Sequence, residues 1–286
     1  MPRTWLITGY SSGFGRELAL AAARNHDTVI ATSRDPSKLA DLKELGVIPR
    51  RLDVQADDAE IQRFIEDILS TVGPIDILVN NAGYILEGAG EECSNEEIED
   101  QFSVNVFSQI RLLRAVLPSM RARRSGVVAN LGSIGGWRGT PAAGFYCASK
   151  AAVAIYTEAL HWEMAPFNID VVCIEPGYFR TSFLTGGHRV IAQNRIPELS
   201  EVTSAARQAL DAYNRQQPGD PVKGAQLIVE ALTRTGRCQG RKLPARLAVG
   251  RDAIHVIGQS LAKEQDMLDT WGEIIATTDC DDVKAV

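Results

Sequence analysis

The chain has few cysteines and histidines, and neither residue type is grouped. Five cysteines and four histidines occur among 286 residues, without a CxxC pair or a Cys/His cluster. This scarcity argues against a disulfide scaffold and against a zinc site. We therefore expect reduced thiols, a cytoplasmic location and no bound metal. The cysteines lie at positions 93, 147, 173, 238 and 280.

Long apolar runs and a basic excess are also missing. No stretch reaches the roughly 18 apolar residues of a membrane-spanning helix. Lys and Arg number 30 against 36 Asp and Glu, and the net charge of -6 argues against general binding to nucleic acid or anionic membranes. A local site for one phosphate is still compatible with this balance. A strand-like run begins at Thr4, so we expect no secretory leader.

The chain does contain short β-branched runs that alternate with longer helical patterns. The runs are continuously apolar, as expected of strands buried on both faces. Between them, apolar residues recur at helical spacing, and Ser94 with Glu97 resembles a capping box, as does Asp57 with Glu60. The expected strands contain Trp5-Leu6-Ile7, Val29-Ile30-Ala31, Val47-Ile48, Ile77-Leu78-Val79, Val127-Val128-Ala129, Val171-Val172-Cys173-Ile174 and Leu247-Ala248-Val249.

This alternation predicts an α/β fold, a Rossmann-type doubly wound sheet of about seven parallel strands with helices on both faces. We expect a single domain over residues 1–286. Residues 178–218 break the rhythm and carry no strand signal, so we expect a substrate lid there, with a possible helix over 203–215 and a hinge at Thr185-Gly186-Gly187. Residues 219–286 form a C-terminal extension.

A glycine-rich turn follows the first expected strand and opens the first helix. It reads Thr8-Gly9-Tyr10-Ser11-Ser12-Gly13-Phe14-Gly15, a TGxxxGxG spacing. Glycine allows a tight turn and close approach of the backbone to a phosphate, and the helix N-terminus offers free N–H groups and its positive dipole end. The position between strand and helix is the context that a dinucleotide site requires.

The end of the second expected strand bears on the choice of cofactor. An acidic residue there would bond the ribose hydroxyls of NAD, but the sequence has Ser33-Arg34. Arg34 can form charge-assisted bonds to the ribose phosphate of NADP, with Ser33 as a second donor. A solvated surface arginine is the alternative. Asp53 and Val54, after the third strand, would face the adenine.

Four polar residues form a candidate catalytic set. Tyr146 and Lys150 are four residues apart in a helical stretch, so they lie on one face, one turn apart. A free tyrosine has a pKa near 10, and we expect the nearby ammonium to lower it. Ser133 follows the fifth expected strand, where its hydroxyl could hold a substrate oxygen. Asn105 lies on the apolar face of its helix, where a buried amide needs partners.

These motifs together resemble the short-chain dehydrogenase/reductase family over most of the chain. The matches are TGxxxGxG, then Asn80-Asn81-Ala82-Gly83, then Ser133 with the YxxxK of Tyr146 and Lys150, and last Pro176-Gly177 followed by Thr181. The region from 224 to 271 loosely resembles the hydroxysteroid- and retinol-dehydrogenase-like subgroup. One departure is Ser12, where some NADP-preferring members carry a basic residue.

The resemblance implies a role for each matched residue. Tyr146 is the general acid or base, Lys150 tunes it and bonds the nicotinamide ribose, Ser133 steadies the substrate oxygen, and Asn105 holds a water in a proton relay through Lys150. Helices around Asn105 and from Tyr146 to Pro166 would pair with a partner subunit in a homodimer or homotetramer. The implied cofactor-binding set is Gly9, Ser11, Ser12, Gly13, Phe14, Gly15, Ser33, Arg34, Asp53, Val54, Asn81, Ala82, Gly83, Tyr146, Lys150, Pro176, Gly177 and Thr181.

Three functions are compatible with these residues. The first is an NADP-dependent carbonyl reductase or alcohol dehydrogenase that acts on a small-molecule carbonyl or alcohol. The second is a biosynthetic cyclase or isomerase on the same fold, and the third is a non-catalytic module that senses NADP. We expect an apolar, fairly large substrate. The candidate pocket residues are Ile85, Leu86, Gly135 to Arg138 with Trp137, Phe179, Phe183 and Leu184.

Overall fold

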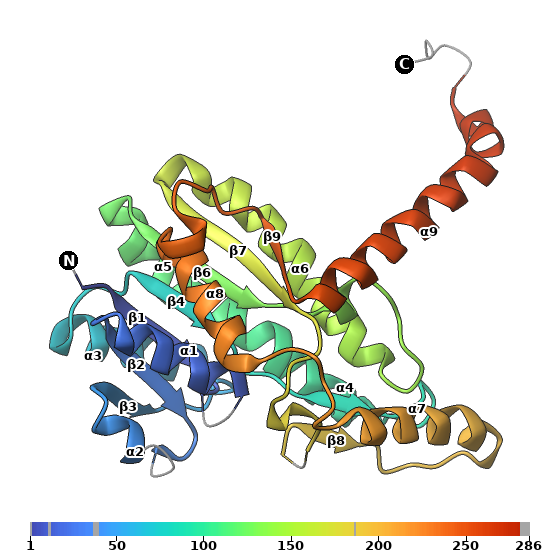
Figure 1. Cartoon of the computed structure of the whole chain (residues 1–286), viewed down its shortest axis with the longest axis horizontal. Helices are drawn as coiled ribbons and strands as arrows, with labels where there is room; N and C mark the ends of the chain where they lie inside the picture. The colour runs from blue at the N-terminus through green and yellow to red at the C-terminus, as the bar shows by residue number, and fades with distance from the viewer. Residues whose placement is uncertain (1, 11–12, 37–39, 186, 281–286) are drawn as a thin grey trace.

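A seven-stranded parallel sheet forms the centre of the computed structural model, which describes residues 2–10, 13–36, 40–185 and 187–280 (Figure 1). All seven predicted runs lie in it, in the order β3-β2-β1-β4-β6-β7-β9. Because β1 lies beside both β2 and β4, the chain reverses its direction of winding there, and ligands bind at such a switch point. The strands are β1 (Thr4–Thr8), β2 (Thr28–Ser33), β3 (Val47–Arg51), β4 (Ile77–Asn80), β6 (Gly126–Leu131), β7 (Ile169–Pro176) and β9 (Arg246–Val249).

Helices cover both faces, as predicted. Helices α1 (Gly13–Arg24) and α8 (Pro221–Thr233) pack on the face to which Trp5 and Ile7 point. Helices α3 (Asp58–Thr71), α5 (Ser108–Arg123) and α6 (Gly144–Met164) pack on the opposite face, where Leu6 points. Successive side chains of β1 thus enter opposite cores, which explains why the strand is apolar without alternation.

Capping fixes where two of the helices begin. The carboxylate of Asp57 accepts from the Glu60 amide at the start of α3, and Ser94 with Glu97 forms a complete capping box at α4 (Asn95–Phe102). A π-helical segment, Ser103–Phe107, joins α4 to α5. The remaining short helices are α2 (Ala40–Lys43) and the 3-10 turns Ile134–Gly136, Ala165–Phe167, Ser182–Leu184, Pro197–Leu199, Gly236–Cys238 and Ala276–Thr278.

The lid segment differs from the prediction, because it does contain a strand. Strand β8 (Arg189–Ile191) pairs in parallel with β5 (Ile85–Glu87) as a second, two-stranded sheet. Each strand has three residues, too few to show a periodicity in the sequence. Helix α7 (Ser200–Tyr213) lies over the predicted helix and begins three residues earlier. Gly186 of the predicted hinge falls outside the described residues, and its neighbour Gly187 has φ +93°.

Helix α9 (Arg251–Ile275) leaves the body of the molecule, as Figure 1 shows. Its first turns pack on the sheet layer through Ala253 and Val256, which contact Ile134. No helix in the described ranges has both the length and the apolar character needed to cross a membrane.

Candidate active site

The ends of β1 and β4 are joined by one side chain. The amide of Asn81 donates to the carbonyl oxygens of Thr8 and Gly9 at 3.0 and 2.8 Å. Its backbone N–H donates to the Thr8 hydroxyl at 3.1 Å. Gly9 has φ +65°, and a Cβ there would lie 2.5 Å from the Cα of Ala82. Only glycine tolerates both the conformation and the contact, so the turn after β4 can lie against the turn after β1.

The rest of the glycine turn faces the segment that follows β7. Gly13 has φ +63°, and its missing Cβ would lie 3.5 Å from the Thr181 side chain. Phe14 packs edge-on against Phe179, with ring centroids 4.6 Å apart. A Cβ on Gly15 would lie 2.5 Å from the Asn81 amide nitrogen. The matched positions therefore lie together, while Ser11 and Ser12 fall outside the described residues.

Ser133 and Tyr146 lie side by side. The two side chains lie beside Gly135, where a Cβ would be 3.2 Å from the Tyr146 ring and 3.4 Å from the Ser133 Oγ. The Ser133 hydroxyl accepts from the Gly135 amide at 3.0 Å. Lys150 is 4% exposed; its Nζ donates to the Leu131 carbonyl at 2.7 Å and lies 5.9 Å from the centre of the Tyr146 ring. Strand β6 and helix α6 thus bring these three side chains to one place.

The predicted effect of Lys150 on Tyr146 is wrong for this structure. Burial raises the pKa of the Tyr146 phenol above its ordinary value, and the hydrogen bond with Ser133 lowers it only in part. Burial also lowers the pKa of Lys150 from 10.5 to about 8. Loss of hydration penalises the charged form of each group, and this outweighs any attraction across the separation of the two side chains.

Asn105 lies in the π-helical segment, a feature frequent at functional sites. Its amide accepts from the Tyr84 N–H at 3.0 Å and donates to the Tyr84 carbonyl at 3.0 Å and the Ser149 hydroxyl at 3.1 Å. A Cβ on Gly83 would lie 3.1 Å from the Asn105 Oδ1 and 3.6 Å from the Lys150 Nζ. Asn105 therefore ties the segment after β4 to α6, beside Lys150; its part in a proton relay stays a prediction.

The predicted cofactor residues at the ends of β2 and β3 are accessible. Arg34 is exposed and makes no ion pair with the described part of the chain. The hydroxyl of Ser33 donates to the Asp35 carbonyl at 2.8 Å, so its proton is already used. Asp53 is exposed and accepts from the Gln55 amide, whereas Val54 packs on the core beneath α3.

A carboxylate that sequence reasoning missed supports the turn after β7. Pro176 ends β7, and a Cβ on Gly177 would collide with the carboxylate of Asp252 at the start of α9. The same carboxylate accepts from the Tyr178 amide at 2.6 Å. Thr181 follows, and its hydroxyl accepts from the Phe183 amide. Asp252 had no signal in the sequence, because its partner is far along the chain.

These elements enclose a cavity of about 640 Å³ that runs from Gly9 and Gly13 to Tyr146 and on beneath α7. Of the predicted pocket residues, Leu86, Gly136 and Trp137 do not line it. Leu86 packs with Cys93 and Ala192, and Trp137 lies 3.8 Å from the Arg246 guanidinium and donates to Glu175. The lining includes Ile85, Gly135, Arg138, Phe179, Phe183, Leu184, Val202, Ala206, Leu210 and Tyr213.

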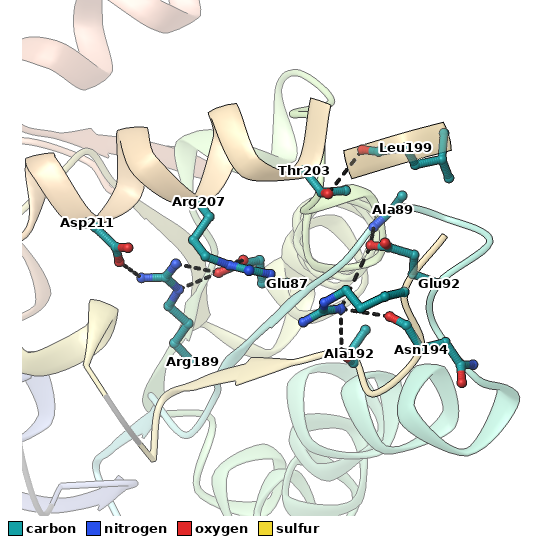
Figure 2. A network of polar contacts seen from close by, with 11 residues as sticks. Glu87, Ala89, Glu92, Arg189, Ala192, Asn194, Leu199, Thr203, Arg207 and Asp211 are labelled. Atoms are coloured by element: carbon teal, nitrogen blue, oxygen red, sulfur yellow. Dashed lines mark hydrogen bonds and ion pairs between the residues drawn. The ribbon is translucent and has the colours of Figure 1, made fainter. Parts of the chain in front are cut away.

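Helix α7 roofs this cavity, and a buried carboxylate holds it there (Figure 2). Glu87 of β5 is 1% exposed and pairs with Arg189 of β8 at 2.5 Å and with Arg207 of α7 at 2.7 Å. Asp211 of α7 completes the chain through Arg189. The apolar spacing of Val202, Ala206 and Leu210 in the sequence is a signal that could have placed α7 over the pocket.

The residues present fit a dinucleotide. Three glycines, Gly9, Gly13 and Gly83, face one cavity with Tyr146 and Lys150, and each would meet a neighbour if it carried a Cβ. Arg34 offers a guanidinium just after β2 that forms no ion pair with any residue in the described ranges. In the described ranges, no group of three or more His, Cys, Asp or Glu side chains could hold a metal ion.

Comparisons with known proteins agree with this geometry. Residues 3–188 match the family model described as short chain dehydrogenase. The 3-ketodihydrosphingosine reductase of Bacteroides thetaiotaomicron is 36% identical over 246 residues, 86% of this chain and 82% of that protein. Human retinol dehydrogenase 8 is 37% identical over 190 residues, 64% of this chain and 60% of that protein. A crystal structure of a short-chain dehydrogenase from Streptomyces avermitilis superposes with a TM-score of 0.88 at 39% identity, over 97% of this chain and 98% of that one.

Glu87→Gln keeps the shape of the buried side chain but removes the charge that pairs with both arginines. Breaking a buried ion pair costs about 3–5 kcal/mol, and here the cost falls on the contact that holds α7. We expect faster amide exchange in residues 189–211 and a KM for the substrate raised at least about tenfold. Asp211→Asn is the control, because the Asp211 side chain is 61% exposed and an exposed pair contributes less than about 1 kcal/mol. Equal effects of the two variants would contradict this role.

The lowered pKa of Lys150 can be measured directly. Burial penalises the ammonium, so the amine should be protonated below about pH 8 and neutral above it. We expect the NMR signal of the isotope-labelled Lys150 Nζ in the cofactor-free protein to titrate near pH 8, with the Lys150→Arg variant identifying the signal. Titration near the ordinary value of 10.5 would show that the ammonium is hydrated.

Proposed function

Because the chain belongs to the short-chain dehydrogenase/reductase family, a family of oxidoreductases, we propose that it is an NADP-dependent carbonyl reductase or alcohol dehydrogenase. The reaction moves a hydride between NADPH and the carbonyl carbon of a ketone or aldehyde. The observation that carries the proposal is the placement of Ser133 and Tyr146 side by side on the wall of a largely apolar cavity, with Lys150 in the same lining.

The chemistry divides between the cofactor and the chain. When bound, the nicotinamide supplies or accepts the hydride. The raised pKa of Tyr146 keeps the phenol protonated at neutral pH, so in reduction it can give its proton to the carbonyl oxygen. Ser133 can donate to the same oxygen and hold it within reach of Tyr146. The Lys150 Nζ faces the cavity with donors to spare for a ribose hydroxyl.

The substrate is proposed to be apolar and fairly large. Phenylalanine, leucine and alanine side chains from the lid line the cavity with Tyr146, and the volume of about 640 Å³ lies in the range of small-molecule sites. Two relatives support this class by name, since one is a reductase of 3-ketodihydrosphingosine and the other a dehydrogenase of retinol. Both compounds carry one oxygenated carbon that reacts and a long apolar part.

NADP rather than NAD is proposed on the strength of Arg34. Its guanidinium stands at the end of β2 without an ion-pair partner in the described part of the chain, and no acidic residue precedes it on the strand. Such a group binds a phosphate on the ribose more strongly than a free hydroxyl, because only the phosphate adds a charge-assisted bond. The oxidation of NADPH in the presence of a panel of long-chain ketones, with equal formation of alcohol, separates this proposal from a cyclase or isomerase and from a sensor of NADP.

A homodimer or homotetramer and a cytoplasmic location complete the proposal. Phe107, Ile155 and Trp162 are exposed on the π-helical segment and α6, which is where the family resemblance places the subunit contact. All five cysteines are free thiols, and three of them are buried. Free cysteines, three of them buried, are compatible with a reducing compartment.

Tyr146→Phe removes the proton but keeps the ring and its packing. General acid–base catalysis contributes roughly 10²–10⁴-fold, so we expect turnover to fall by at least that factor. The affinity for NADPH should stay near that of the unaltered chain. Tyr178→Phe is the control, because Tyr178 lines the same cavity and packs on Tyr213. Near-normal turnover in Tyr146→Phe would refute the assignment.

Arg34→Ala tests the cofactor. A charge-assisted bond to a phosphate contributes roughly 1.5–3 kcal/mol, so the dissociation constant of NADPH should rise about ten- to a hundredfold. The constant for NADH should hardly change. Arg24→Ala, at the far end of α1, controls for the loss of one positive charge. An equal loss of affinity for NADPH and NADH, or a preference of the unaltered chain for NADH, would show that Arg34 does not select between the two cofactors.

A further inference from the structure

Helix α9 has almost no contact with the rest of the molecule. Only its first turns are packed, through Ala253 and Val256. From residue 261 to the last described residue, 280, every side chain is exposed, and Gly272 alone is partly covered. With 25 residues the helix is about 37 Å long, and it points away from the sheet (Figure 1).

A helix in this position lacks the usual source of stability. Isolated helices shorter than about 12–15 residues are marginal in water, and most helical stability in proteins comes from packing of an apolar face. The free part of α9 also contains Gly272, a poor helix former. We therefore expect another surface to pack against the free part of α9 and stabilise it.

The apolar side chains of α9 follow a seven-residue repeat. Ile254, Leu261, Leu268 and Ile275 are spaced by seven, and Ile257 and Trp271 stand three residues after the first and third of them. These are the two seam positions of a heptad, with Glu264 at the one seam position that is not apolar. A repeat of 3.5 residues keeps the seam facing a second helix that supercoils with the first.

The exposed surface has the size that a dimer needs. Ile254 is 70% exposed and Trp271 53%, and five more large apolar residues of α9 are exposed beside them. Together they present on the order of 800 Å², which is what one partner contributes to an interface of standard size. The five are Leu261, Met267, Leu268, Ile274 and Ile275.

The charge of α9 argues against a membrane as the surface that covers it. Beyond residue 260 the helix carries Glu264, Asp266, Asp269 and Glu273 against the single cation Lys263. Helices that lie on membranes carry Lys and Arg on the polar face, so an acidic helix of this kind is repelled by an anionic bilayer. A second copy of the chain offers an identical seam of matching length, as a two-fold interface requires.

We propose that α9 is a dimerisation arm, which pairs with α9 of a second copy of this chain through the heptad seam from Ile254 to Ile275. The arm is separate from the exposed face of α6, so two kinds of contact are available to the molecule. If both form, they build a tetramer from two pairs. The proposal does not depend on the chemistry proposed for the cavity.

The test replaces two seam residues by glutamate. Leu261→Glu/Leu268→Glu puts charge into the seam without touching the body, and light scattering at micromolar concentration measures the particle mass. We expect the mass of the unaltered chain to be an even multiple of the monomer and to halve in this variant. Ala262→Glu/Thr270→Glu is the control, because it adds the same charge off the seam and should keep the mass. An unaltered chain that is monomeric, an unchanged mass in the seam variant, or an equal loss in the control would overturn the proposal.

A second pair of measurements separates the two contacts and removes the concern that the seam variant unfolds. Ile155→Glu/Trp162→Glu alters the face of α6, and this variant should still be at least a dimer; a monomer would overturn the proposal. In the unaltered chain, amide exchange in residues 260–275 should be slow at micromolar concentration and faster on dilution. Exchange that does not depend on concentration would also overturn it.

Discussion

A buried chain of side-chain hydrogen bonds across the middle of the sheet is the interaction on which the site depends. The Asn80 amide donates to the Asn130 side chain at 2.8 Å, and the Asn130 amide donates to the Thr157 hydroxyl at 2.9 Å. The first of these residues is in β4, the second in β6 and the third in α6, and all three are fully buried. The Asn80 Oδ1 has no hydrogen-bond partner among the described residues, but each of the two bonds satisfies a buried donor, and an unpaired donor there would be costly. The two bonds therefore help to fix how α6 sits on the sheet.

The two halves of the site follow from this arrangement. Helix α6 carries Tyr146 and Lys150, and the residue after Asn80 is Asn81, whose amide holds the glycine turn against the end of β4. Two sets of polar contacts, joined through the backbone of Asn80 and Asn81, therefore position the dinucleotide turn and the proton donor on the same sheet. Helix α7, which covers the cavity, is held by a different contact. This contact is the ion pair of Arg207 with the buried carboxylate of Glu87, which is separate from the contacts that fix α6 on the sheet.

Much of this could be predicted from local pattern, and the failures have physical reasons. Continuous apolar runs predicted the seven strands, because burial on both faces leaves that signature in the sequence itself. The pairing of β5 with β8 could not be predicted, since three-residue strands carry no period and their register depends on segments far apart in the chain. Trp137 was predicted to line the pocket because it follows Ser133 at the end of a strand, but its ring packs against the Arg246 guanidinium instead. The pKa of Tyr146 is raised because its phenol is buried, and the spacing of Tyr146 and Lys150 in the sequence does not reveal that burial.

The central claim is that this site passes a hydride between a nicotinamide and an apolar carbonyl. The most direct test is to supply NADPH that carries deuterium at both positions of the nicotinamide C4, together with a long-chain ketone, and to examine the product by mass spectrometry. The account predicts an alcohol with one deuterium, bonded to the former carbonyl carbon. An alcohol without deuterium, or consumption of NADPH without alcohol, would contradict it.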